Sequence, residues 1–164
     1  MLIVSDTTPL HYLIILDKAE ILETLFSEII LPEAVFTELQ HERTPKQVLR
    51  WIADLPDWIK VKSANPATLE NIEGLGKGET EAIAIALEES ADAVLMDDRK
   101  AIREARKKNI LVITTISILE LAAIKNLLDF PTVLNELAQT TFRLPPDEII
   151  EEYLNRDVER KQNF

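Results

Sequence analysis

Acidic side chains follow two apolar segments of the sequence that we expect to form strands. Asp6 comes directly after residues 2–5 (LIVS), and Asp97 and Asp98 come directly after residues 93–96 (AVLM). In an open parallel sheet, ligands bind beyond the carboxyl ends of the strands, so both segments would deliver acids to one edge. Each acid taken alone is also explained by capping of a helix N-terminus, because aspartate is a preferred N-cap residue.

A third acid, Glu38, lies in residues 32–40 (PEAVFTELQ), which begin with proline as many helices do. It follows Val35 by three positions and would share its helix face. A carboxylate among core-facing residues is costly unless a cation or hydrogen-bond donors meet it. A salt bridge to Arg43 or Lys46 is the structural alternative.

All three glycines of the chain, at positions 74, 76 and 78, fall in the segment 74–89 (GLGKGETEAIAIALEE). Such residues let the backbone turn tightly and approach another group closely. Their spacing fits neither the Walker loop nor the dinucleotide-binding fingerprint. Glu79 and Glu81 then open a largely apolar helix, where acids also favour the helix dipole. Glu81 shares a face with Ile85, which points it inward.

If these acids converge, their repulsion either raises their pKa values or requires a bound cation. The chain has no cysteine and two histidines, so disulfides and thiolate metal sites are excluded and the available ligands are oxygens. Oxygen ligands suit Mg²⁺ or Mn²⁺ and argue against zinc.

The elements that must position these acids alternate along the chain. Apolar runs typical of strands occupy residues 2–5, 28–31, 58–61, 93–96 and 110–113. Proline marks the expected helix starts at Thr8-Pro9, Leu31-Pro32, Thr44-Pro45 and Asn65-Pro66. This alternation predicts a doubly wound, three-layer α/β/α fold whose central parallel sheet has about five strands and helices on both faces. We expect one domain over residues 1–164, with a helical C-terminal extension at about 129–164.

The composition is 46% apolar and 29% charged, which is typical of a soluble globular protein. We expect a cytoplasmic location and no membrane contact, because the N-terminus lacks the basic lead-in of a signal peptide and no apolar run approaches a membrane span. The net charge of −11 argues against broad attraction to nucleic acid. The strongly basic residues 99–108 (RKAIREARKK) are either a solvated helix face or a local basic contact.

In combination, these features resemble the PIN domain family of metal-dependent nucleases, common as toxins of prokaryotic toxin–antitoxin pairs. The sequence is most similar to a prokaryotic branch described as predicted nucleic-acid-binding proteins. The resemblance covers about residues 1–145 and rests on four motifs in order, which are IVSDTTPLHYL, VFTEL, GKGETEAIA and DDRK. By matching positions, it implies that Asp6, Glu38, Glu81 and Asp98 are the catalytic quartet and bind metal, with Glu79 and Asp97 as alternative ligands.

Two positions depart from the family pattern. Many PIN domains have aspartate where Glu81 aligns, and many carry threonine or serine two residues before the last acid, where this chain has Met96. That hydroxyl helps to hold metal or water. Its absence therefore argues against a second metal ion and against full activity. Thr8 matches the small polar residue after the first acid and is expected to line the pocket.

The resemblance implies hydrolysis of a phosphodiester by water activated on one or two Mg²⁺ or Mn²⁺ ions, usually in single-stranded RNA. We expect basic residues beside the pocket to bind the nucleic-acid backbone, namely Arg43, Lys46, Arg50, Arg99, Lys100 and Arg103. The affinity for nucleic acid should then fall as the salt concentration rises.

Relatives often pair with an antitoxin protein or form homodimers. Ile116, Leu119 and Ile124 supply either an apolar dimer seam or part of this chain's own core. The alternative to a nuclease is a catalytically weak or inactive PIN-like module that binds nucleic acid or a protein partner. The net charge of −11 and Met96 favour that alternative.

Overall fold

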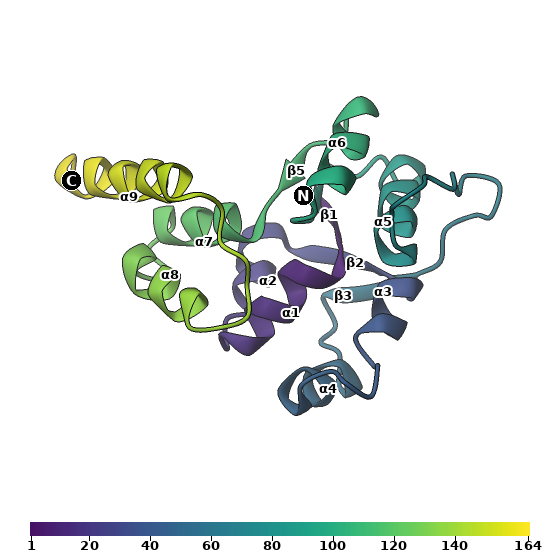
Figure 1. Cartoon of the computed structure of the whole chain (residues 1–164). Helices are drawn as coiled ribbons and strands as arrows, with labels where there is room; N and C mark the ends of the chain where they lie inside the picture. Colours follow the sequence, from purple (N-terminus) through teal and green to yellow (C-terminus); the bar gives the residue numbers. More distant parts are fainter. The chain divides into compact units, whose positions relative to one another are not determined.

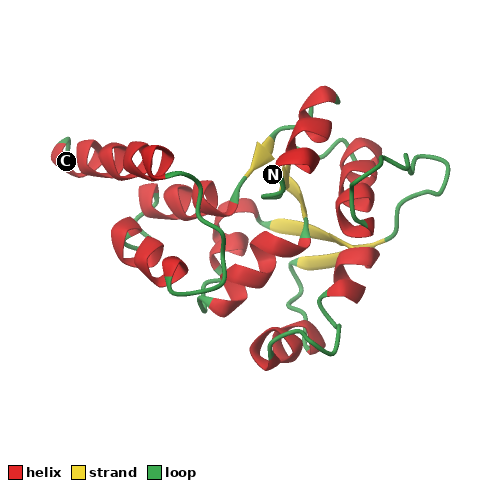
Figure 2. Cartoon of the chain, viewed as in Figure 1, coloured by secondary structure: helices red, strands yellow, loops and turns green.

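The computed structural model describes all 164 residues and contains a five-stranded parallel sheet with helices between the strands (Figure 1, Figure 2). The strands are β1 (Leu2–Ser5), β2 (Glu28–Pro32), β3 (Ile59–Lys62), β4 (Ala93–Leu95) and β5 (Val112–Ile113). The helices are α1 (Thr7–Ile15), α2 (Ile21–Phe26), α3 (Glu33–Glu38), α4 (Lys46–Ala53), α5 (Lys77–Glu88), α6 (Arg99–Lys107), α7 (Thr115–Ile124), α8 (Phe130–Ala138) and α9 (Asp147–Gln162). None of them combines the length and hydropathy that a membrane-spanning helix requires. The architecture is the three-layer α/β/α fold that the sequence predicts.

The strands are ordered β3-β2-β1-β4-β5, and every neighbouring pair is parallel. The chain therefore winds outward from β1 to one edge and returns on the other side of β1. Ser5 at the end of β1 is aligned with Leu95 at the end of β4, so these two strands end at the same level. The winding direction switches between them, which is where open α/β sheets bind ligands.

The central strands are buried on both faces, as parallel strands usually are. Val4, Ile30 and Val94 pack with the apolar side of α5 and with α6. Ile3 and Ile29, which alternate with them along the strands, are fully buried on the opposite face. Residues 82–86 of α5 are all buried, because the helix packs on β1, β2 and β4. This packing holds the first turn of α5 beside the strand ends.

The chain forms two compact units, residues 1–115 and residues 116–164. The first contains the sheet and α1 to α6, and the second contains most of α7 together with α8 and α9. The second unit thus begins before residue 129, where the helical extension is expected. Within it, Asp129 caps α8 and its carboxylate pairs with Lys161 of α9 at 2.7 Å. The assignment of the whole chain to a single domain stays a prediction.

One expected helix is absent, since Asn65-Pro66 begins a turn. The Asn65 side-chain oxygen accepts the Ala67 N–H at 3.0 Å, and the Thr68 N–H donates to the Asn65 carbonyl at 2.9 Å. Asparagine side chains that bond to a backbone amide two residues on compete in this way with helix formation.

The last strand is shorter than the apolar run 110–113. The Ile110 N–H bonds to the Ala105 carbonyl at 3.1 Å and so belongs to the end of α6. Asn109, with a φ of 59°, supplies the left-handed residue that ends a helix in this way.

Candidate functional site

Asp6 is the N-cap residue of α1, but its side chain makes no capping hydrogen bond. The residue is only 4% exposed, and no lysine or arginine pairs with it. Burial raises the pKa of Asp6 to about 7; a hydrogen bond from the Thr7 backbone amide opposes the shift, and the charges of Glu79, Glu38 and Asp97 add to it. Helix capping therefore does not account for this carboxylate.

Glu38 is the last residue of α3, and it is exposed rather than packed among core residues. Its Oε2 accepts a hydrogen bond from Thr7 Oγ1 at 2.8 Å. Thr7, and not Arg43 or Lys46, is therefore its partner. Because Thr7 follows Asp6, this bond holds the end of α3 beside the start of α1.

Gly78, in the first turn of α5, lies where two of these carboxylates converge. A Cβ atom at this position would lie 3.3 Å from Glu38 Oε2 and 3.4 Å from Asp6 Oδ1. It would also lie 3.0 Å from Val35 Cγ2. Both carboxylates thus approach one point on α5, where a Cβ would be tight against Val35 and Glu38 and in ordinary contact with Asp6.

Glu79 belongs to the same group of acids. Burial, together with the charges of Asp98 and Glu38, raises the pKa of Glu79. Its Oε2 accepts the Gly76 N–H at 2.9 Å, which completes a capping box at the start of α5. This bond fixes one oxygen and leaves Oε1 without a partner.

Both carboxylate oxygens of Glu81 accept hydrogen bonds from backbone amides. Its Oε2 accepts the Ala34 N–H at 2.6 Å, and its Oε1 accepts the Ala64 N–H at 3.0 Å. Residues two apart on a helix do not share a face, so Glu79 and Glu81 cannot both point to the strand ends. Both oxygens of Glu81 are thus engaged, whereas Glu79, the alternative ligand, keeps Oε1 free.

Glu81→Gln is therefore expected to destabilise the protein by about 2 kcal/mol, because two backbone amides lose a charged acceptor. Urea unfolding in EDTA, followed by circular dichroism, measures this change. Glu79→Gln is the matched control and should unfold at the same or a higher urea concentration. Equal stability of the two variants would contradict the structural role of Glu81.

The two aspartates after β4 also differ in their partners. Asp98 caps α6, since its Oδ1 accepts the N–H groups of Lys100 and Ala101, each at 2.9 Å. Its Oδ2 remains free. Asp97 instead accepts the Thr115 N–H at 2.9 Å and the Thr115 Oγ1 hydroxyl at 2.6 Å. Burial raises the pKa of Asp97, and these bonds oppose the shift. Both Asp97 oxygens are thus engaged, whereas Asp98 has one to offer.

We call Asp6, Glu38, Glu79 and Asp98 the acid cluster. No three carboxylate or histidine side chains in the structure are arranged to hold a metal ion directly. Mg²⁺ usually keeps several waters and binds proteins through one or two carboxylates. An all-oxygen set with no lysine or arginine paired to it, in which burial and like charges raise the pKa values of Asp6 and Glu79, fits such a hydrated ion.

Comparison with known proteins assigns the family. A family model described as a PIN domain matches residues 2–158. The chain belongs to the PIN domain family. Its structure is similar to that of a PilT N-terminus domain protein from the hyperthermophilic archaeon Sulfolobus solfataricus P2. The TM-score is 0.52 at 14% identity, over 88% of this chain and 100% of that chain, so the likeness concerns the fold alone. No curated protein sequence matches the chain.

The structure also shows the contacts of other residues that the sequence assigned to the site of this PIN domain. Thr7, rather than Thr8, donates its hydroxyl to the cluster. Met96, which occupies the position where many PIN domains have a hydroxyl residue, is fully buried in the core beneath α5. Lys100 Nζ donates to the Glu73 carbonyl and is therefore already engaged.

The remaining basic residues expected to contact a nucleic-acid backbone are exposed and form no ion pair: Arg43, Lys46, Arg50, Arg99 and Arg103. Two of them, Arg99 and Arg103, lie one turn apart on α6 directly after Asp98. Lys77, which sequence reasoning missed, lies beside the acid cluster at the start of α5. Its position between Gly76 and Gly78 was the feature of the sequence that could have indicated it.

An open groove of about 960 Å³ adjoins the acid cluster. Its walls are α3, the start of α5 and the loop that precedes α5. Glu38 and Gly78 line the groove, and Gly78 is also the residue that the carboxylates of Glu38 and Asp6 approach. The groove and the acid cluster are therefore adjacent and share the Glu38 side chain.

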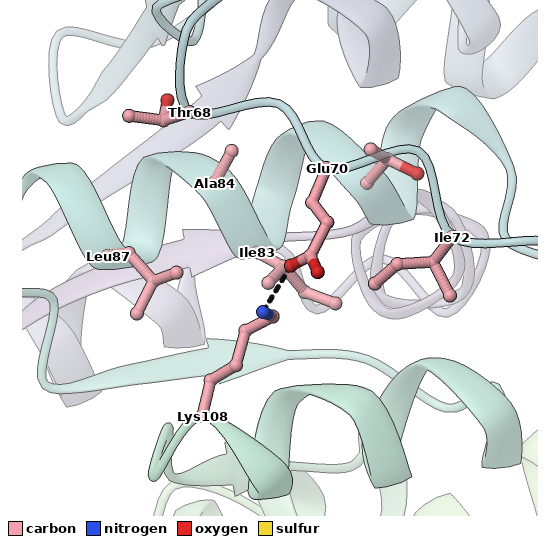
Figure 3. Close-up of a pocket in the computed structure, with 8 residues that line it drawn as sticks. Thr68, Glu70, Ile72, Ile83, Ala84, Leu87 and Lys108 are labelled. Atoms are coloured by element: carbon pink, nitrogen blue, oxygen red, sulfur yellow. Dashed lines mark hydrogen bonds and ion pairs between the residues drawn. The ribbon is translucent and has the colours of Figure 1, made fainter.

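The loop that forms one wall of the groove is fixed from its other side. Figure 3 shows Glu70 of this loop paired with Lys108, which follows α6, close to Ile83 of α5. Lys100 of α6 binds the Glu73 carbonyl of the same loop. The pocket around the Glu70–Lys108 pair holds only about 10 Å³, so it is too small for a ligand.

The apolar residues considered for a dimer seam are mostly core residues. Ile116 and Leu119 are buried within the chain, as the core interpretation predicts. Ile124 is 51% exposed and is the one of the three that is free to contact a partner.

Proposed function

We propose that this PIN domain is a metal-dependent nuclease, an endoribonuclease that cleaves single-stranded RNA at the acid cluster. Asp6 carries this proposal, because it is a buried carboxylate beside other acids and forms no ion pair with a lysine or arginine. Such a group is costly to bury, and strongly perturbed carboxylates gather at functional sites. PIN domains are generally nucleases, which agrees with this use of the cluster.

The ligands proposed for one or two Mg²⁺ or Mn²⁺ ions are Asp6, Glu38, Glu79 and Asp98. When bound, the ion supplies a water of lowered pKa and offsets charge on the phosphodiester. The protein holds three of the carboxylates in place through hydrogen bonds from Thr7, from the Gly76 amide and from the first turn of α6. Without cations the cluster repels phosphate, so binding of RNA at this site should depend on metal.

We propose that the exposed arginines after Asp98, Arg99 and Arg103, bind the RNA backbone. Neither has an ion-pair partner in the structure, so contact with phosphate breaks no internal bridge. Binding of this kind releases counterions and weakens as salt rises. Arg43, Lys46 and Arg50 are proposed to contact the backbone on the side of α4.

The test is cleavage of end-labelled single-stranded RNA, with DNA of the same sequence as the comparison, in Mg²⁺, in Mn²⁺ and in EDTA. We expect fragments from RNA in either metal, none in EDTA, and recovery when metal is restored. Metal-dependent binding of RNA without cleavage would instead support the inactive binding module. Cleavage that persists in EDTA would overturn the metal mechanism.

The family resemblance extends the proposal to partners and place. An antitoxin protein would inhibit the nuclease in the cytoplasm, and a second copy would form a homodimer. The acid cluster depends on neither partner, since all four acids come from one chain.

A further inference from the structure

The groove beside the acid cluster has a lining that does not suit a phosphate chain. Three of its charged residues are acidic, namely Glu33, Glu38 and Glu81, and Lys77 is the single basic one. Such a wall repels phosphate oxygens. Its apolar part comes from the loop before α5, where Leu69 is 43% exposed and Leu75 is partly exposed. The groove therefore fits a neutral group with an apolar face.

Asn71 provides the polar side chain that a ligand in this groove could engage. Its amide makes no hydrogen bond within the protein, although it lines the groove. Two acids of the lining are already engaged, because Glu33 accepts a bond from Ser63 and Glu81 accepts two backbone amides. An amide offers two donors and one acceptor, the groups that pair with the edge of a nucleobase.

We infer that the groove seats one unstacked base of the single-stranded substrate, with its face on Leu69 and Leu75 and its edge towards Asn71. This inference rests on the proposed function. Because Glu38 and Gly78 line both sites, a phosphate held at the acid cluster places a neighbouring base at the mouth of the groove. Lys77, beside that mouth, is placed to balance the charge of the next phosphate.

The groove is open without a ligand, and the loop that forms its wall is held by the Glu70–Lys108 ion pair (Figure 3). The hydrogen bond from Lys100 to the Glu73 carbonyl holds the same loop. Small-ligand sites are usually preformed in this way. The wall is aliphatic rather than aromatic, so contact with the base should contribute less than stacking on an aromatic ring does.

The experiment compares RNA oligonucleotides that carry a single abasic ribose at each position in turn. Affinity is measured by fluorescence anisotropy with Ca²⁺ in place of Mg²⁺, for the wild type and for Leu69→Ser and Asn71→Ala. One abasic position, adjoining the mapped cleavage site, should weaken binding to the wild type about tenfold. In both variants affinity for intact RNA should fall by a similar factor, and the abasic change at that position should have little further effect.

Leu111→Ser is the matched control, because Leu111 is 59% exposed and lies outside the groove. It should keep the wild-type sensitivity to the abasic position. If RNA binds but Leu69→Ser and Asn71→Ala respond to abasic positions as the wild type does, the base site is overturned and the nuclease proposal stands. If neither the wild type nor any variant binds RNA, whichever metal is added, both proposals fail together.

Discussion

Asp6→Asn is expected to lower RNA cleavage by at least about 100-fold and, at the same time, to stabilise the metal-free protein at neutral pH. Both effects have one cause. An asparagine amide lacks the negative charge that holds a divalent cation, and it is less costly to bury than an ionised carboxylate. A merely structural aspartate would show the opposite effect on stability.

The pH dependence of the stabilisation has a defined sign. The folded-state pKa of Asp6, about 7, lies above its ordinary value of 3.8, so the unfolded chain releases this proton at a lower pH than the folded protein does. As pH rises from about 4 to about 7, the wild type should therefore lose stability, and above that range the loss should level off. The pKa difference means that the free energy of unfolding of the wild type falls by about 4 kcal/mol over this pH range. Asp6→Asn has no carboxyl group at this position, so its free energy of unfolding should not show this fall.

Thermal unfolding in EDTA between about pH 4 and pH 8, followed by circular dichroism, measures this difference. Added Mg²⁺ should raise the Tm of the wild type at the upper end of this range and have a much smaller effect on Asp6→Asn. A variant that retains cleavage would rule out the acid cluster as the reaction site. A variant that melts earlier than the wild type at pH 8 in EDTA would contradict the cost assigned to the buried charge.

The second large effect is expected at Gly78. Gly78→Ala should lower the cleavage rate roughly 10- to 100-fold, because a Cβ there is tight against Val35 and the Glu38 carboxylate, so that α3 and Glu38 must shift beside Asp6. Inside a helix, replacement of glycine by alanine usually stabilises by about 1 kcal/mol, so loss of activity need not follow from unfolding. Single-turnover cleavage rates together with unfolding curves separate the two effects.

Gly76→Ala is the matched control for this substitution. Its Cβ would meet only Glu79 Oε2, at an ordinary contact distance of 3.8 Å. We expect this variant to keep most of its activity. Equal rates for the two alanine variants would show that Gly78 does not govern the positions of the carboxylates.

Local patterns in the sequence predict most of the fold. Five apolar runs mark the five strands, and Asp129 and Pro146 directly precede α8 and α9. Asn65-Pro66 misleads, because the same residues that start helices also build turns. The side chain of Asn65 binds the Ala67 amide and so selects the turn.

The choice among neighbouring acids depends on partners that are distant in the sequence. Glu81 is held by the amides of Ala34, 47 residues away, and Ala64, 17 residues away. Asp97 is held by Thr115, 18 residues away. No spacing within the motif reveals these partners, so the sequence could not separate Glu79 from Glu81 or Asp97 from Asp98.

The sequence by itself determined that acids follow β1 and β4 and that an oxygen-rich cation site is the chemistry to expect. These conclusions depend on the order of apolar and acidic residues along the chain and on the rule that parallel strands end at one edge. Only the tertiary structure decided which carboxylates remain free, and it alone revealed the groove beside them. Hydrogen bonds and close packing between distant segments set both, because they depend on distances in space rather than on distances along the chain.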